Sequence, residues 1–249
     1  MTSNFQEDYS KIQPLMFEVE GRIQKAKKVL SVITDFVGET KDKDLLDIGC
    51  STGIMTNYYS DYFKSIDAID IDAGGIKHAT ETNSAENINY VVSPVEDFIE
   101  EKKYDVITCS HIYEHVPDSK KLFVKIYELL KPGGVCYLAA GNRYQIYENH
   151  YGLYFLSYFP KKVSNLYLKL TNKGDYYYEN HLSLFKLRKL VKKFNVHDYT
   201  IKIIKNPSKY SASEMFVQNS FSHKIIKFFS TYVYFFIPTY IWILEKPSE

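Results

Sequence analysis

Apolar and polar positions change their period along the chain, and each period predicts a different element. Between Ile12 and Val37 apolar side chains recur every three or four residues, which predicts one long or two short amphipathic helices. From Leu45 to Asn142 short apolar runs alternate with helical patterns, which predicts βαβ units and a mostly parallel sheet. The predicted strands are 45–48, 65–71, 88–92, 104–109 and 135–140, and the predicted helices follow Gly53 and occupy 73–84 and 122–130.

After Asn142 this alternation stops. Residues 143–181 are aromatic and basic without a clear period, which indicates an insertion into the sheet fold. Beyond the insertion the pattern predicts further elements that complete the fold. They are a helix at 182–194, a strand at 196–204, one or two aromatic helices at 222–237 and a last strand at 240–244.

The composition agrees with this fold class, and the charges divide the chain into an acidic N-terminal part and a basic C-terminal part. The 249 residues are 45% hydrophobic and 24% charged, which is typical of a soluble globular chain and fits one large domain. The net charge of +1 hides a split, because residues 1–150 carry 16 basic and 24 acidic side chains and residues 151–249 carry 15 and 6. A basic, aromatic C-terminal part suits an anionic substrate or a membrane surface. A codon bias toward Lys, Tyr, Ile and Asn is the alternative explanation.

Cysteine usage and apolar runs bear on location. Cys50, Cys109 and Cys136 are odd in number and widely spaced, so they predict neither a disulfide framework nor a metal site, and we expect a reducing compartment. The first nine residues are polar and acidic, unlike a secretion signal. The apolar run 228–244 is interrupted by Ser, Thr and Pro and falls short of a membrane span. We therefore expect a cytoplasmic protein, in which 222–244 either contacts a membrane surface or is buried.

One stretch carries the clearest chemistry. Residues 47–53 read Asp-Ile-Gly-Cys-Ser-Thr-Gly, which places a carboxylate at a strand end and small residues in the turn into a helix, where a ligand can approach the backbone closely. Asp70 ends the next strand, where a carboxylate can accept both hydroxyls of a ribose. The Gly-x-Gly-x-x-Gly pattern of dinucleotide enzymes is not met. Asp47 would repel a pyrophosphate but suits a ligand with an ammonium and a sulfonium group, namely S-adenosylmethionine.

Five segments in register resemble class I S-adenosylmethionine-dependent methyltransferases: 47–53, Asp70, 95–98, 104–116 and 129–134. The resemblance is strong over 22–142. It implies an α/β fold, a Rossmann-like seven-stranded, mostly parallel sheet with helices on both faces, an antiparallel last strand and an aromatic lid inserted after strand five. The single domain would then comprise N-terminal helices (1–44), a cofactor core (45–142), the lid (143–181), which resembles that of ubiquinone-biosynthesis O-methyltransferases, and C-terminal helices with two strands (182–249).

The same resemblance implies which residues contact the cofactor. Ser51 departs from the family pattern, in which Gly is commoner, and Glu96 beside Asp97 leaves the adenine-binding register open by one residue. The predicted cofactor contacts are Asp47, Gly49, Cys50, Ser51, Gly53, Asp70, Ile71, Asp97, Phe98 and Ser110.

Histidine is the side chain whose pKa suits removal of a proton from a hydroxyl near neutral pH. His111, just past strand four, and His150, in the lid, are the catalytic candidates. His115 is expected to serve in packing, and His181 precedes a predicted helix. Methyl transfer from a sulfonium also proceeds by alignment of the reactants alone, so a base need not exist.

The function predicted is methyl transfer to an oxygen, rather than a nitrogen, of a small molecule, sugar or lipid-linked acceptor. A non-catalytic S-adenosylmethionine-binding or regulatory protein is one alternative. A nucleic-acid methyltransferase is another, which the basic C-terminal part favours, but residues 110–113 read Ser-His-Ile-Tyr instead of Asn-Pro-Pro-Tyr or a catalytic Cys motif. The aromatic lid residues either line an acceptor pocket or pack the lid. Acceptor identity and oligomeric state are not predicted.

Overall fold

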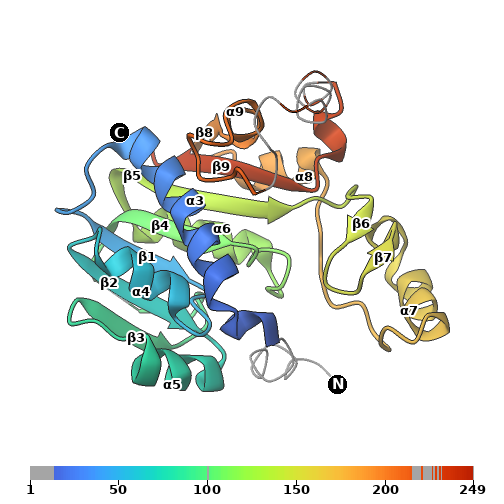
Figure 1. The fold of residues 1–249 in the computed structure, drawn as a ribbon, viewed down its shortest axis with the longest axis horizontal. Coiled ribbons are helices and arrows are strands. Elements are labelled where there is room, and N and C mark those ends of the chain that lie inside the picture. Colours follow the sequence, from blue (N-terminus) through green and yellow to red (C-terminus); the bar gives the residue numbers. More distant parts are fainter. Residues whose placement is uncertain are drawn as a thin grey trace.

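A seven-stranded sheet organises the chain in the computed structural model, which describes residues 14–99, 101–214 and 232–248, and residues 220, 226, 228 and 230 between them. The strand order is β3-β2-β1-β4-β5-β9-β8 (Figure 1). The five strands β1 to β5 pair in parallel, and β9 pairs antiparallel with both β5 and β8, as the sequence predicted. The strands are β1 Asp44–Ile48, β2 Ser65–Asp70, β3 Ile88–Val92, β4 Tyr104–Ser110, β5 Leu130–Gly141, β8 Asn195–Asp198 and β9 Thr239–Glu245.

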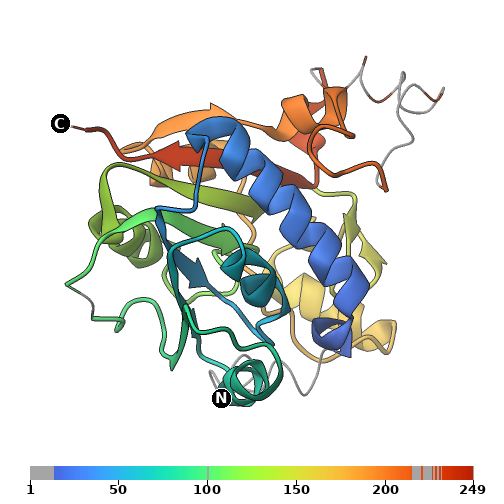
Figure 2. The ribbon, with the colours of Figure 1, turned by 60° about the vertical axis from the view of Figure 1, so that its left-hand side comes forward.

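Helices cover both faces of this sheet. Neighbouring residues in a strand point to opposite faces, so Val106 and Ile107 of β4 belong to two different apolar cores. Helices α3, α4, α5 and α9 pack on the first core, and Figure 2 shows α3 running across the sheet, whereas α6 and α8 pack on the second. These helices are α3 Val19–Val37, which follows a short 3₁₀ turn η1 Pro14–Phe17, α4 Ile54–Ser60, α5 Ala73–Thr82, α6 Ser119–Leu129, α8 Leu184–Leu190 and α9 Thr200–Lys205.

Acidic side chains determine where three of these helices begin. Glu18, Asp72 and Asp118 each accept hydrogen bonds from two backbone N–H groups in the first turn of the helix that follows. Such caps satisfy donors that have no partner within the helix and favour its positive end. The cap at Asp118 explains why α6 starts at Ser119, three residues before the predicted start.

The strand predicted at 196–204 is wrong in its second half. The strand β8 ends at Asp198, whose Oδ1 accepts a hydrogen bond from the Thr200 backbone N–H at 2.9 Å and turns the chain into α9. The β-branched side chains suggested a strand, but burial of Thr200, Ile203 and Ile204 follows helical spacing. A short, strongly β-branched run was therefore assigned the wrong period.

The insertion after β5 forms a separate lobe, which we call the lid (residues 143–181; Figure 1). The lid has its own small apolar core of Leu153, Leu156, Leu168 and Tyr177. Its two ends lie side by side, because Asn142 and Leu182 form a parallel β-bridge. It contains the hairpin β6 Tyr147–Glu148 and β7 Leu153–Tyr154, the 3₁₀ turn η2 Leu156–Tyr158 and the helix α7 Lys161–Leu170, which the sequence pattern did not predict.

The aromatic segment near the C-terminus is described only in part. Seven of the 16 residues predicted as helices at 222–237 lie outside the described residues, and Tyr234–Phe236 form a 3₁₀ turn, η3. Residues Tyr240–Leu244 are buried in β9, at the middle of a three-strand pairing, so this end of the predicted membrane-contact segment cannot reach lipid. Among the described residues, the helices are all too short or too polar to cross a membrane.

Candidate active site

The turn between β1 and α4 is built from residues in the left-handed backbone region. Gly49, Ser51 and Gly53 have φ angles of +79°, +53° and +75°. A Cβ atom on Gly49 would lie 2.1 Å from the Ile112 side chain, and one on Gly53 would lie 2.5 Å from the hydroxyl of Tyr90. Both glycines are therefore required by space as well as by φ. Ser51 also adopts a conformation that favours glycine, which explains why glycine is commoner at this position of the family motif.

Two carboxylates border this turn. Asp47, near the end of β1, accepts hydrogen bonds from the hydroxyls of Thr56 at 2.6 Å and Thr108 at 2.5 Å, and burial raises its pKa. Asp70, the last residue of β2, accepts the backbone N–H of Ser51 at 2.8 Å through Oδ2 and that of Asp72 at 2.9 Å through Oδ1. Burial also raises the pKa of Asp70. Both acids thus lie at the carboxyl edge of the sheet, where open α/β sheets bind ligands.

The other predicted cofactor contacts surround the same edge, with one difference in exposure. Cys50 and Phe98 are buried, and Ile71 and Ser110 are half-buried at the ends of β2 and β4. Asp97 is exposed in the loop after β3. The predicted residues therefore converge from the ends of four parallel strands, and Asp97 is the most open to solvent.

The start of the helix α3 approaches this edge as well. The Thr52 hydroxyl donates to the Met16 carbonyl at 2.6 Å, and the Arg22 guanidinium lies beside Met55 and Met16. The positive charge of Arg22 partly offsets the effect of burial on the pKa of Asp47. The sequence analysis did not single out Arg22, because a lone arginine in an amphipathic helix has no motif around it.

His111 lies directly after β4 in a strained backbone conformation. Its φ is +57°, and its N–H donates to the Ala139 carbonyl of β5 at 2.8 Å. Its Nδ1 lies 3.0 Å from Oε1 of Glu114, which is fully buried. Burial alone would raise the pKa of Glu114, but His111 and the nearby His115 and His181 hold it at about 2. Glu114 is therefore ionised and fixes the orientation of the His111 ring.

His150, the second catalytic candidate, comes from the lid and reaches the same region. Its Nδ1 lies 2.7 Å from Oε1 of the buried Glu148. Its ring stands 5.2 Å from the ring of His115, centroid to centroid. Burial would lower the pKa of His150, but the hydrogen bond to Glu148 and the carboxylate of Glu179 raise it. The structure thus brings the lid candidate against the loop that carries His111 and Glu114.

The two histidines not chosen as catalytic candidates belong to this cluster too. His115 is mostly buried, which lowers its pKa to about 4. His181 accepts or donates a hydrogen bond at Nδ1 with the Tyr177 hydroxyl at 2.9 Å, and burial lowers its pKa. Its Nε2 lies within 2.6 Å of the place where a Cβ on Gly141 would stand, so β5 must end in a residue without a side chain. His115 was expected to serve in packing, and its mostly buried side chain also lies beside the carboxylate of Glu179.

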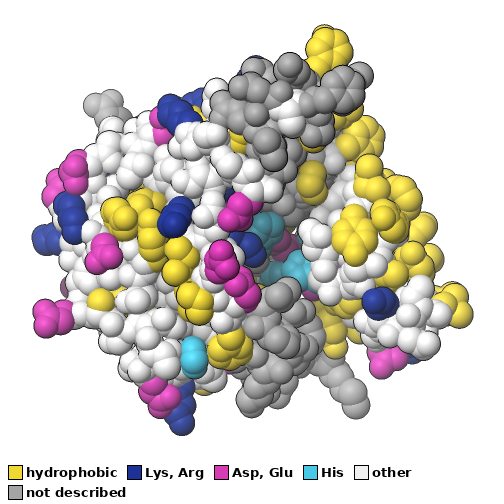
Figure 3. All heavy atoms as spheres, in the orientation of Figure 1, with side chains coloured by type: hydrophobic (Ala, Val, Ile, Leu, Met, Phe, Trp, Pro, Cys, Tyr) yellow, Lys and Arg dark blue, Asp and Glu magenta, His cyan; other side chains and the backbone are white. Residues whose placement is uncertain are grey.

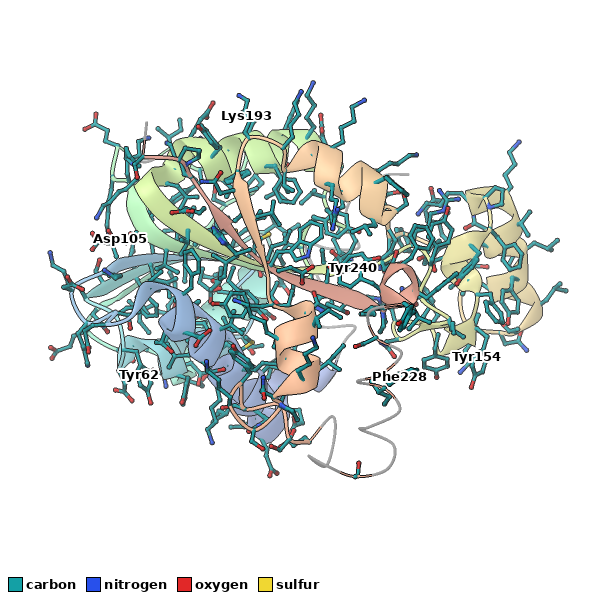
Figure 4. The ribbon with its side chains drawn as sticks, turned by 90° about the horizontal axis from the view of Figure 1, so that it is seen from above. Tyr62, Asp105, Tyr154, Lys193, Phe228 and Tyr240 are labelled. Atoms are coloured by element: carbon teal, nitrogen blue, oxygen red, sulfur yellow. The ribbon has the colours of Figure 1, made fainter. Side chains whose placement is uncertain are left out.

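We call the whole set the His–Glu cluster. Its three carboxylates, Glu114, Glu148 and Glu179, were not among the predicted site residues. Two of them stand in short sequence motifs that could have indicated them, Glu114 in His-x-x-Glu-His and Glu148 in Glu-Asn-His. Figure 3 shows histidine side chains in a hollow between the sheet and the lid, and in Figure 4 Tyr154 marks the lid and Tyr240 the sheet. The members are His111, Glu114, His115, Glu148, His150, Glu179 and His181.

The cluster adjoins the turn after β1. The side chain of Ile112, next to His111, occupies the space above Gly49. A family model described as "Methyltransferase domain" matches residues 21–201. The chain belongs to this methyltransferase family. Membership confirms the predicted class I S-adenosylmethionine-dependent methyltransferase and its cofactor.

Curated relatives of this methyltransferase include ubiquinone biosynthesis O-methyltransferases. That of Psychrobacter cryohalolentis is 34% identical over 107 residues, which are 41% of this chain and 42% of the relative. That of Acinetobacter baumannii is 34% identical over 122 residues, which are 46% and 50%. The chain spans about half the length of the curated relatives it matches.

Solved structures share the fold of this methyltransferase at low identity. The putative methyltransferase bound to the Trm112 activator of Haloferax volcanii has a TM-score of 0.60 and 13% identity, over 99% of this chain and 100% of that structure. The N-methyltransferase NodS of Bradyrhizobium japonicum, solved with S-adenosyl-L-homocysteine, has a TM-score of 0.52 and 10% identity, over 90% and 86%. These likenesses support the fold and leave the acceptor open.

Proposed function

We propose that this methyltransferase transfers a methyl group from S-adenosylmethionine to an oxygen of a small molecule, sugar or lipid-linked acceptor. The observation that carries the proposal is the contact between Nδ1 of His111 and Oε1 of Glu114, which lie 3.0 Å apart. Both residues belong to the loop that packs against the turn after β1. A hydroxyl must lose its proton as it accepts a methyl group, so a base held beside the cofactor turn serves an oxygen acceptor. A neutral amine has a free lone pair and needs such a base less.

The residues at the sheet edge fit the cofactor. Gly49 and Gly53 allow the left-handed backbone of the turn, and Asp70 retains acceptor capacity for a ribose, because a carboxylate has about four acceptor sites and two are used. We propose that the other predicted residues around this turn also contact the cofactor. When bound, S-adenosylmethionine supplies an electrophilic methyl group on a sulfonium. The contacts are Asp47, Gly49, Cys50, Ser51, Gly53, Asp70, Ile71, Asp97, Phe98 and Ser110.

His111 is the better supported of the two base candidates. Glu114 binds Nδ1, which leaves Nε2 of a partly exposed ring for the acceptor proton. Because the pKa of Glu114 is held at about 2, its charge is present throughout the neutral range and stabilises the imidazolium that forms. His150 has the same pairing with Glu148 but lies deeper, with 25% of its side chain exposed against 46% for His111.

The lid supports a lipid-linked acceptor or a peripheral position at a membrane. Its helix α7 buries Ser164 and Leu168 and leaves Val163, Leu166 and Leu170 exposed to 46, 57 and 75%. An exposed apolar stripe on a helix that also carries lysines is typical of interfacial helices. The variant Leu166→Glu should lower binding of the chain to anionic vesicles in a sedimentation assay, whereas Val124→Glu, on the exposed side of α6, should not. Equal binding by both variants would remove this support.

The cofactor assignment is tested by calorimetric binding of S-adenosylhomocysteine. We expect Asp70→Ala to weaken binding by roughly 10- to 100-fold, since it removes charge-assisted hydrogen bonds worth about 1.5–3 kcal/mol. The surface variant Asp61→Ala, at the end of α4, is the control and should bind as the wild type does. Unaltered binding by a folded Asp70→Ala protein would refute the ribose assignment.

The reaction is tested by release of S-adenosylhomocysteine with a panel of phenols, sugars and isoprenoid-linked hydroxyl compounds. Turnover with a hydroxyl acceptor and none with its amine analogue is the expected result. Turnover with the amine alone would contradict an oxygen acceptor. Cofactor binding without turnover on any member of the panel would favour a binding protein over an enzyme.

A further inference from the structure

We propose that His115, His150 and Glu179 form a binding site for one divalent transition-metal ion of the Zn²⁺ type. The ligating atoms of these three side chains all lie within 4.8 Å of one another. The site goes beyond the proposed methyl transfer and does not depend on it, because metal binding can be measured without cofactor or acceptor.

The three ligands come from separate parts of the chain and meet where the lid touches the sheet. His115 lies on the loop after β4, His150 follows the lid strand β6, and Glu179 lies near the lid's end. Nδ1 of His115 is 4.0 Å from Oε1 of Glu179, and the two imidazole rings are 5.2 Å apart. Ligands at about 2.1 Å from one ion lie roughly 3.4 Å apart in a tetrahedron, so the site would close by about 1 Å.

One of the three proposed ligands has a buried carboxylate oxygen without a partner. Glu179 is 2% exposed, and within the described ranges its Oε2 has no hydrogen-bond partner. The neighbouring Glu114 is fully buried, and its Oε2 also lacks a partner among the residues described. Burial of an unpaired carboxylate oxygen is costly, and a bound cation would offset that cost.

Glu148 provides the support that a metal-bound histidine ordinarily has. Its Oε1 lies 2.7 Å from Nδ1 of His150, and its Oε2 accepts the backbone N–H of Tyr151 at 3.1 Å. Glu148 thereby fixes the ring, with Nε2 left as the nitrogen available to the ion. A carboxylate bonded to the far nitrogen of a ligand histidine is a recurrent feature of zinc sites.

The ligand types select the class of metal. Two imidazoles and one carboxylate suit Zn²⁺ and its neighbours in the first transition row, whereas Mg²⁺ and Ca²⁺ prefer oxygen ligands throughout. Three protein ligands leave a coordination position for water or for a hydroxyl of the acceptor. His115 lies on the loop after β4, and His150 and Glu179 lie in the lid. A bound ion would therefore also fasten the lid to the sheet.

The test uses the full chain, freed of metal with a chelator and then titrated with Zn²⁺ by calorimetry in the absence of cofactor and acceptor. We expect one ion per chain, retained through dialysis and counted by elemental analysis. A rise in Tm on addition of Zn²⁺ is expected because the ion binds only the folded chain. Co²⁺ should replace Zn²⁺ and give the visible absorption of a four- or five-coordinate site.

Glu179→Gln and His150→Ala should each weaken Zn²⁺ binding by at least roughly tenfold. His197→Ala is the matched control, since His197 also pairs with a glutamate, Glu245 at 2.9 Å, but on the distant strand β8. Binding of S-adenosylhomocysteine to metal-free protein shows that the variants are folded and reports separately on the methyltransferase assignment. Failure of the wild-type chain to bind Zn²⁺, or equal affinity in Glu179→Gln and His197→Ala, would overturn the site.

Discussion

The edge of the sheet and the lid build their halves of the candidate active site in different ways. At the sheet edge the important groups are bare backbone and two carboxylates, held within a segment of the chain that runs from Asp47 to Asp70. In the His–Glu cluster they are titratable side chains from the loop after β4 and from two separate parts of the lid. The first arrangement requires particular backbone angles, and the second requires tertiary packing that brings distant residues together.

The largest effect expected is on catalysis, and it tests whether the two halves have separate tasks. His111→Asn should lower kcat by about 100-fold or more, because it removes the group that takes the acceptor proton. The affinity for S-adenosylhomocysteine should stay within about twofold, since the turn after β1 is untouched. Steady-state kinetics measures kcat and calorimetry measures the affinity. His197→Asn is the control, for which both should match the wild type. An equal loss in affinity would show that the two halves are not separate.

A second prediction concerns the backbone at the sheet edge. Gly53→Ala should lower the free energy of unfolding by about 2–4 kcal/mol, because its Cβ would meet Tyr90 and Ala79 at 2.5–2.6 Å in addition to the strain of positive φ. Gly38→Ala has the same sign of φ but open space around its Cβ and should cost about 1–2 kcal/mol. Urea denaturation measures both. Equal costs would mean that φ alone matters at Gly53.

The smallest effect expected is a gain in stability, whereas the glycine variants lose stability. Burial raises the folded-state pKa of Asp47, so the protonated form is favoured in the folded chain, and this contribution is present at low pH and lost as pH rises through the folded pKa. At pH 7 the charge therefore costs stability. Asp47→Asn should raise the free energy of unfolding and weaken S-adenosylhomocysteine binding. Urea denaturation at pH 7 is the measurement, and a less stable variant would contradict the sign.

The difference between the two halves also explains what could be predicted from the sequence. Alternating periods predicted the five parallel strands, and the turn motif predicted its glycines, because these features depend on residues close together in the chain. The antiparallel direction of the last strand was implied by the family resemblance alone. The strand assigned to 199–204 was wrong, since the hydrogen bond from the Thr200 N–H to Asp198 turns the chain into α9, and a short β-branched run was read with the period of a strand.

The lid could not be predicted in the same way. Glu179 has no motif around it, and its role depends on a meeting with His115 that only the folded chain creates. The helix α7 did have a signal, because Val163, Leu166 and Leu170 recur at the helical spacing of three and four, but this apolar stripe is exposed and the helix buries Ser164 and Leu168 instead.

The bridge between Asn142 and Leu182 has a consequence for how such enzymes diversify. The Arg143 N–H donates to the Leu182 carbonyl at 3.1 Å, so the chain leaves the sheet and returns to it at almost the same point. A segment whose ends already touch can be exchanged for one of another length without moving the strands on either side. We therefore expect that the lid can be exchanged while the strands that hold the proposed cofactor site stay in place.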